Sequence, residues 1–236
     1  MFTQIKFNLY YFLKYSYKTV LTFWLIFLGF LLFFLCITTL FQSFEIEFVG
    51  VNTLPSLIFT AIFAVLFFKE TFPAIIKFGS SRTSYLFAYV LYLILFTITM
   101  SIISNVFLFA MGYIIDFFHI DNFSYYGINI MDHQIATSQL ILYESFLYMF
   151  FFLVFNIVAA LLYKFGYKVS IVFLIIVSFP IFVRSFADEL FHFFAQFIIT
   201  EKEYSQFSFF ILYIILIGIL WLIVRNQSII DKITNK

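Results

Sequence analysis

The sequence predicts an all-helical protein that crosses a membrane several times. Of its 236 residues, 64% are hydrophobic and 11% are charged, and the mean hydropathy is +1.09. A soluble domain averages about 45–50% apolar and about 25% charged residues, so a water-soluble fold would leave this apolar excess exposed. The apolar residues also gather in long uninterrupted runs. Strands of a membrane barrel alternate apolar and polar residues over about ten positions, so the runs predict helices.

Six apolar runs reach or approach the roughly 20 residues that a helix needs to cross a bilayer. They predict one transmembrane domain over residues 1–236, with spans over 20–41, 52–68, 85–111, 143–163, 169–183 and 207–224. The second and fifth spans are short, and the sequence leaves their ends open. Glu144, one residue into the fourth span, is the single charge inside a run, and we expect its side chain to reach the interface.

Residues 1–19 place lysines among large apolar side chains just before the first span. Lys14 and Lys18 lie four residues apart and therefore share one helical face. A basic, aromatic segment in this position predicts an interfacial helix that lies on the inner leaflet. The alternative is a frayed tail that only helps to orient the first span.

The charges orient the six spans, because basic residues accumulate in cytoplasmic segments. With the N-terminus inside, the inner segments hold eleven basic and two acidic residues, a net charge of +9. The outer segments hold two basic and ten acidic residues, a net charge of −8. We therefore expect both termini in the cytoplasm. The overall net charge of +1 gives no reason to expect a nucleic-acid partner.

The inner connection over residues 69–84 is amphipathic and longer than a simple reversal of direction requires. It has Pro73 near its start and ends in Gly79-Ser80-Ser81, a typical helix stop and turn. The pattern predicts a short helix that lies outside the membrane between two spans. The alternative is an ordinary basic loop.

The outer connections carry most of the acidic residues. Residues 184–206 form an amphipathic pattern with Asp188, Glu189 and His192 on one face, which predicts an outer helix that either dips into the membrane or lies on its surface. Residues 112–142 contain a second group of acidic and histidine residues, which are Asp116, His119, Asp121, Asp132 and His133. Their spacing matches no zinc signature, so we expect a solvated loop and predict no metal site.

Few polar residues lie deep in the spans. They are Ser101, Ser104, Asn105 and Asn156. Hydrogen bonding between helices is their commoner use, and lining of a transport pathway is the alternative. The sequence contains no nucleophile-and-base signature and no Gly-x-x-x-x-Gly-Lys-Ser/Thr loop for nucleotide phosphates. We therefore predict no catalytic residue and no enzyme activity in this chain.

The connection between spans two and three resembles the cytoplasmic loop of type-2 permease subunits of ATP-binding-cassette (ABC) transporters. The resemblance rests on Glu70, an apolar stretch, and then Phe78-Gly79-Ser80-Ser81-Arg82-Thr83-Ser84-Tyr85. The plan of the whole chain is also similar. In that family the loop is a coupling helix that docks into a groove of the ATPase subunit. The resemblance implies a coupling role for Lys69, Glu70, Phe72, Pro73, Lys77, Phe78, Gly79 and Arg82.

The resemblance implies the permease subunit of an exporter in a bacterial plasma membrane. Two cytosolic ATPase subunits would bind ATP and Mg²⁺, and a second permease copy or a paralogue would complete the assembly. The abundant aromatic residues suit a hydrophobic or amphipathic cargo, such as a peptide, lipid or drug. Size and plan are similar to small permeases that export antimicrobial or cytolytic peptides in Gram-positive bacteria, including phenol-soluble-modulin exporters.

The sequence leaves the cargo, the direction of transport and the choice between homodimer and heterodimer open. The alternative function is that of a six-span membrane protein outside the ABC class. It would be a substrate-binding subunit of an energy-coupling transporter or an intramembrane enzyme. Both alternatives require polar groups gathered deep in several spans.

Overall fold

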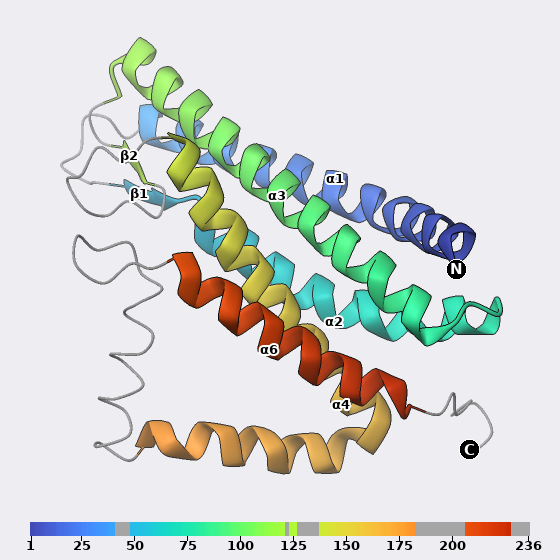
Figure 1. Ribbon diagram of the computed structural model, residues 1–236. Helices are drawn as coiled ribbons and strands as arrows, with labels where there is room; N and C mark the ends of the chain where they lie inside the picture. The colour runs from blue at the N-terminus through green and yellow to red at the C-terminus, as the bar shows by residue number, and fades with distance from the viewer. Residues whose placement is uncertain (41–47, 121–122, 127–136, 183–205, 228–236) are drawn as a thin grey trace, which may run out of the picture. The chain divides into compact units, whose positions relative to one another are not determined.

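The computed structural model describes residues 1–40, 48–120, 123–126, 137–182 and 206–227. For residues 48–51, 123–126 and 167–182 it describes the backbone. The elements, in chain order, are α1 Phe2–Leu40, β1 Phe48–Val51, α2 Thr53–Lys77, α3 Arg82–Phe118, β2 Phe123–Tyr126, α4 Thr137–Phe182 and α6 Gln206–Arg225 (Figure 1).

The described part of the chain contains five helical segments that are long and apolar enough to cross a membrane. They are Phe2–Leu40, Thr53–Lys77, Arg82–Phe118, Thr137–Gly166 and Gln206–Arg225. The prediction of a helical membrane protein is therefore confirmed. The predicted span over 169–183 falls on the second part of α4, which follows a break at Gly166 (φ 78°, ψ 174°) and is helical up to Phe182. Residue 183 lies outside the described residues.

Helix α1 covers both the expected interfacial helix and the first span. It runs from Phe2 to Leu40 without interruption, because no proline stands in this stretch. The expected boundary at residue 19 is therefore absent from the structure. At 1.5 Å per residue this helix is about 58 Å long, about twice the thickness of a bilayer's hydrocarbon core.

The turn between α2 and α3 corrects the prediction of a separate short helix over 69–84. Residues 69–77 continue α2 through Pro73, and α3 begins at Arg82. The predicted stop at Gly79 is confirmed: the Ser80 N–H donates to the Ile75 carbonyl at 3.3 Å, and the Gly79 N–H donates to the Ile76 carbonyl at 2.9 Å. These two bonds form a Schellman motif with Gly79 in the left-handed region at φ 82°.

Two short strands, which the sequence analysis did not predict, pair in parallel. Phe48 in β1 is opposite Phe123 in β2, and the register continues to Val51 opposite Tyr126. Strand β1 leads directly into α2, whereas β2 follows α3 (Figure 1). The pair therefore joins the connection before α2 to the connection after α3.

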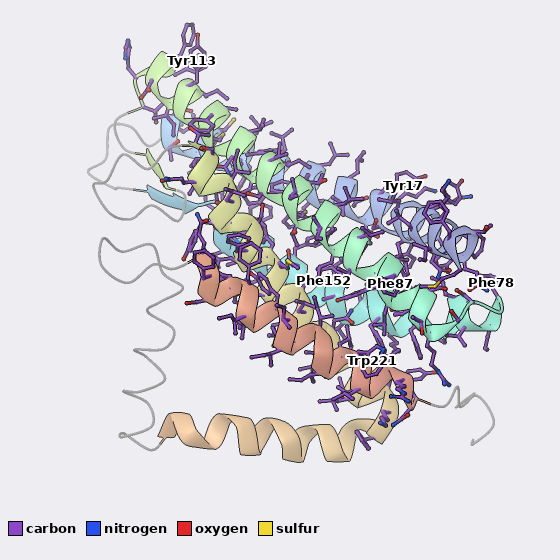
Figure 2. The ribbon with its side chains drawn as sticks, in the orientation of Figure 1. Tyr17, Phe78, Phe87, Tyr113, Phe152 and Trp221 are labelled. Carbon is purple, nitrogen blue, oxygen red and sulfur yellow. The ribbon has the colours of Figure 1, made fainter. Side chains whose placement is uncertain are left out.

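The chain divides into two compact units. The first contains Met1–Phe63 and Ser84–Phe152, and the second contains Ala64–Thr83 and Leu153–Lys236. Aromatic side chains fill the core of the first, where Phe96 lies 5.0 Å from Phe152 and 5.3 Å from Phe63, measured between ring centroids (Figure 2 labels Phe152). Because lipid is as apolar as these side chains, close packing rather than escape from water holds such a core together.

We predict opposite effects of alanine at two glycines that both have open space around them. The Gly79→Ala substitution forces a side chain into the left-handed region and should destabilise the protein by about 1–2 kcal/mol. The matched control Gly218→Ala lies within α6 and should leave stability unchanged or raise it by up to about 1 kcal/mol. Thermal unfolding of the detergent-solubilised protein measures both. Equal effects of the two substitutions would contradict the assigned turn.

Candidate functional site

The predicted coupling residues lie at the end of α2, in the turn after it and at the first position of α3. Most of them are exposed, namely Lys69, Glu70, Lys77, Phe78, Gly79 and Arg82. Phe78 is 65% exposed and projects at this turn (Figure 2). A large aromatic side chain surrounded in the sequence by charged and polar residues gives the turn the character of a contact surface.

Phe72 and Pro73 differ from the other predicted coupling residues. Phe72 is 0% exposed and stacks on Phe68, with ring centroids 5.1 Å apart. Tyr163 packs against its edge at 6.2 Å. Phe72 therefore belongs to the core of the second unit, because it stands four residues after Phe68 on the same helical face. Pro73 is half-buried.

Arg82 joins the exposed turn to the end of α6. Its Nη1 donates to the Arg225 carbonyl at 3.1 Å, and its Nη2 donates to the Gln227 carbonyl at 2.6 Å. The last carbonyls of a helix lack partners within the helix and carry partial negative charge, so a guanidinium group satisfies them well. Gln227 in turn donates from Nε2 to the Ala160 carbonyl at 3.5 Å. The start of α3 is thus bonded to the end of α6.

A second candidate site is a group of buried polar side chains on α2, α3 and α4 and at the residue just before α2, which we name the polar cluster. It consists of Asn52, Thr53, Ser56, Ser101, Ser104, Asn105, Glu144 and Tyr148, none of which is more than 2% exposed. All of them belong to the first unit. The cluster involves the first turn of α2, the middle of α3 and the early turns of α4, whose arrangement Figure 1 shows.

The carboxyl group of Glu144 stands at the centre of the polar cluster. Thr53 donates from Oγ1 to Glu144 Oε1 at 3.0 Å, and Asn105 donates from Nδ2 to Glu144 Oε2 at 2.8 Å. The Ser101 hydroxyl donates to the Ile141 carbonyl at 2.8 Å and, over a longer distance of 3.5 Å, to Glu144 Oε2. One side chain of α4 thereby contacts both α2 and α3.

Three further bonds complete the polar cluster. Asn52, which stands just before α2, donates from Nδ2 to the Ser104 carbonyl at 2.6 Å and to Ser104 Oγ at 2.9 Å. The hydroxyls of Ser56 and Tyr148 share a hydrogen bond of 2.7 Å. The bonds tie α2 and the residue before it to α3 and α4, so the cluster fixes the relative register of these three helices within this unit.

The structure corrects the expectation that Glu144 reaches the interface, because its side chain is 0% exposed among polar partners. It brings together three of the four predicted deep polar residues, Ser101, Ser104 and Asn105. Asn156 lies in the other unit and donates from Nδ2 to the Ala64 carbonyl at 3.2 Å. The sequence analysis missed Asn52, Thr53, Ser56 and Tyr148. Their signal is spacing: Thr53 with Ser56, and Glu144 with Tyr148, each share a helical face.

An apolar groove of about 440 Å³ lies between α1 and α3 in the first unit. Aromatic side chains from both helices line it, including Tyr17, Trp24, Tyr92, Phe96 and Phe107. Its lining offers apolar surface with very few polar groups, which suits a hydrocarbon or aromatic group.

The remaining predicted residues divide between described and undescribed parts of the chain. Asp188, Glu189 and His192 lie outside the described residues, as do Asp121, Asp132 and His133. His119 occupies the left-handed position (φ 51°) of a second Schellman motif, which ends α3.

No family model, curated protein or solved structure matches this chain.

We predict that Asn105→Leu destabilises the protein by about 1–3 kcal/mol, because it removes the amide that bonds Glu144 at nearly constant side-chain volume. Thr99→Val is the matched control: Thr99 is exposed on the same helix, and its hydroxyl bonds only the Leu95 carbonyl at 2.7 Å. The control should change stability by less than about 0.5 kcal/mol. Chemical or thermal unfolding in detergent measures both, and a neutral Asn105→Leu would contradict the central place of this bond.

Proposed function

We propose that this chain is the permease subunit of an ATP-driven exporter, with a separate cytosolic ATPase docked at the turn between α2 and α3. The observation that carries the proposal is the exposed turn around Phe78, which a Schellman motif holds in shape and Arg82 bonds to the end of α6. A loop that only reversed the chain would need neither the exposed aromatic side chain nor the link to a third helix. The resemblance of residues 70–85 to a coupling loop supports the same assignment.

The proposed mechanism transmits movement of the ATPase through the turn. A push on Phe78 acts directly on α2 and α3, since the turn joins them, and it acts on α6 through the two hydrogen bonds of Arg82. Transport requires that the cargo binds the two resulting states with different affinity. The ATP and Mg²⁺ belong to the two ATPase subunits, and a second permease copy or paralogue completes the pathway.

The proposed topology has six spans across the plasma membrane, with both termini on the cytoplasmic side. The charge distribution, +9 in the inner segments and −8 in the outer segments, supports this orientation. The second part of α4 supplies the fifth span, after the break at Gly166, and α6 supplies the sixth. The first turns of α1 lie at the inner interface. A bacterial origin is part of this proposal.

The proposed cargo is hydrophobic or amphipathic, and an amphipathic peptide is the favoured class. The groove between α1 and α3 supports this choice, because aromatic and aliphatic side chains line it and would accept the apolar face of such a molecule. A sugar or an ion would find few partners there.

The polar cluster favours one alternative, a substrate-binding subunit of an energy-coupling transporter, because it gathers polar groups from three helices. The groups of the cluster bond mainly to one another. This arrangement is typical of contacts between helices rather than of a set of groups that await a polar substrate. The permease therefore remains the leading proposal.

We predict that the chain co-purifies with the ATPase encoded beside its gene and that Phe78→Ala lowers the affinity of this complex at least tenfold. Removal of a central aromatic contact commonly costs about 2 kcal/mol of binding free energy, which exceeds a factor of ten. Phe117→Ala is the matched control, since Phe117 is also 65% exposed but stands at the other end of α3. Binding is measured by titration of the ATPase onto the purified membrane subunit.

Two outcomes would overturn the proposed function. Either the ATPase does not bind at all, or it binds equally well to Phe78→Ala, Glu70→Gln and the unmodified chain. Reduced binding with unchanged thermal unfolding of the variant supports docking at the turn, because it separates loss of contact from loss of fold.

A further inference from the structure

We infer that Glu144 is a proton-binding site: in the arrangement that the structure describes, its carboxyl group carries a proton and is a neutral acid. This inference stands independently of the proposed function, because it concerns the polar cluster and requires no ATPase. The ligand is a proton, and the site is made by side chains of α2, α3 and α4.

Among the residues that the structure describes, no charged side chain bonds Glu144. Its side chain is 0% exposed, and its hydrogen-bond partners are the uncharged Thr53, Ser101 and Asn105. A carboxylate removed from water without a cationic partner carries a large desolvation cost even after its surroundings relax. Within a membrane-spanning helix, water cannot reduce that cost as it does at a protein surface. A bound proton removes the charge.

The hydrogen-bond geometry fits a neutral acid. A hydroxyl oxygen can accept as well as donate, so a proton on Oε1 can be donated to Thr53 Oγ1 across the same 3.0 Å. Oε2 then acts as the carbonyl oxygen that accepts from Asn105 Nδ2 at 2.8 Å. The Ser101 hydroxyl has one hydrogen, which it donates to the Ile141 carbonyl at 2.8 Å and, over the longer distance of 3.5 Å, to Oε2. Ser101 is therefore a weak partner for an ionised carboxylate.

The polar cluster suits a proton better than a metal cation. A cation needs several oxygen ligands directed at one point. Asn52 and Asn105 instead direct their NH₂ groups inward, at Ser104 and Glu144. Among the described residues, no three His, Cys, Asp or Glu side chains gather where they could hold a metal ion.

Among the described residues, the other side chains of the polar cluster offer no ionisable group that bonds Glu144. Asn52 stands just before α2, Thr53 and Ser56 belong to α2, and Ser101, Ser104 and Asn105 belong to α3; none of these six is ionisable. On α4 the hydroxyl of Tyr148 bonds Ser56 and is the second titratable group of the cluster. Release of the proton from Glu144 would therefore leave a carboxylate among uncharged groups.

We predict that the infrared spectrum of the purified full chain at neutral pH contains the C=O stretching band of a protonated carboxyl group. The Glu144→Gln substitution should abolish this band, so the difference between the spectra of the unmodified chain and the variant should contain it. The glutamine mimics the neutral acid, because its amide nitrogen can donate to Thr53 while its oxygen accepts from Asn105. Its thermal unfolding should therefore match that of the unmodified chain. Asp116→Asn removes an exposed carboxylate and should keep the band.

Any of four results would overturn the inference. The band is absent at neutral pH, it survives Glu144→Gln, or Glu144→Gln unfolds the protein and thus shows that the negative charge is required. A shift of carboxylate bands on addition of Na⁺ that Glu144→Gln removes would assign the site to a cation instead, which also contradicts the inference. A rise in pH that removes the band from the unmodified chain supports the inference without any substitution.

Discussion

A polar group that is buried among membrane-spanning helices must find its hydrogen-bond partners within the protein, and the first unit depends on this constraint. Glu144 cannot turn toward water, so Thr53 of α2 and Asn105 of α3 must both lie within hydrogen-bond distance of its carboxyl group. The pairs Asn52–Ser104 and Ser56–Tyr148 repeat the requirement on either side. A slip of one residue along any of these helices would break several bonds at once. The polar cluster therefore specifies one packing of helices whose apolar surfaces alone would tolerate several.

Aromatic packing supplies what the polar cluster leaves undetermined. Phe63, Phe96 and Phe152 interlock below the cluster in the first unit, and Phe68, Phe72 and Tyr163 do the same in the second. Many other phenylalanines remain on the outside, with Phe207, Phe210 and Phe87 among the exposed ones. The 41 phenylalanines thus serve two purposes, internal packing and contact with the surrounding lipid. Composition gives only the total number of phenylalanines and therefore does not show which of them pack inside and which face lipid.

Features that depend on residues close together in the sequence were mostly predicted correctly, and features that depend on residues far apart in the sequence were missed. Long apolar runs predicted the helices, and Gly79 predicted where α2 stops, because both depend on neighbouring residues. The continuity of α1 and α2 past the expected boundaries was missed, since a change from apolar to mixed composition marks a change of surroundings rather than the end of a helix. The burial of Glu144 was missed because it depends on residues from three helices. The strands β1 and β2 were missed for the same reason, as neither forms without the other.

The parallel pairing of β1 with β2 has a consequence for the order of assembly. Phe48 and Phe123 are separated in the sequence by all of α2 and α3, so their pairing closes a long loop and repays its entropy with only a four-residue ladder. Such a contact cannot nucleate folding and must wait until α2 and α3 stand side by side. During synthesis, the connection before α2 and the connection after α3 therefore remain separate until α3 has been made. The strand pair is therefore a product of the packing of α2 and α3 rather than its cause.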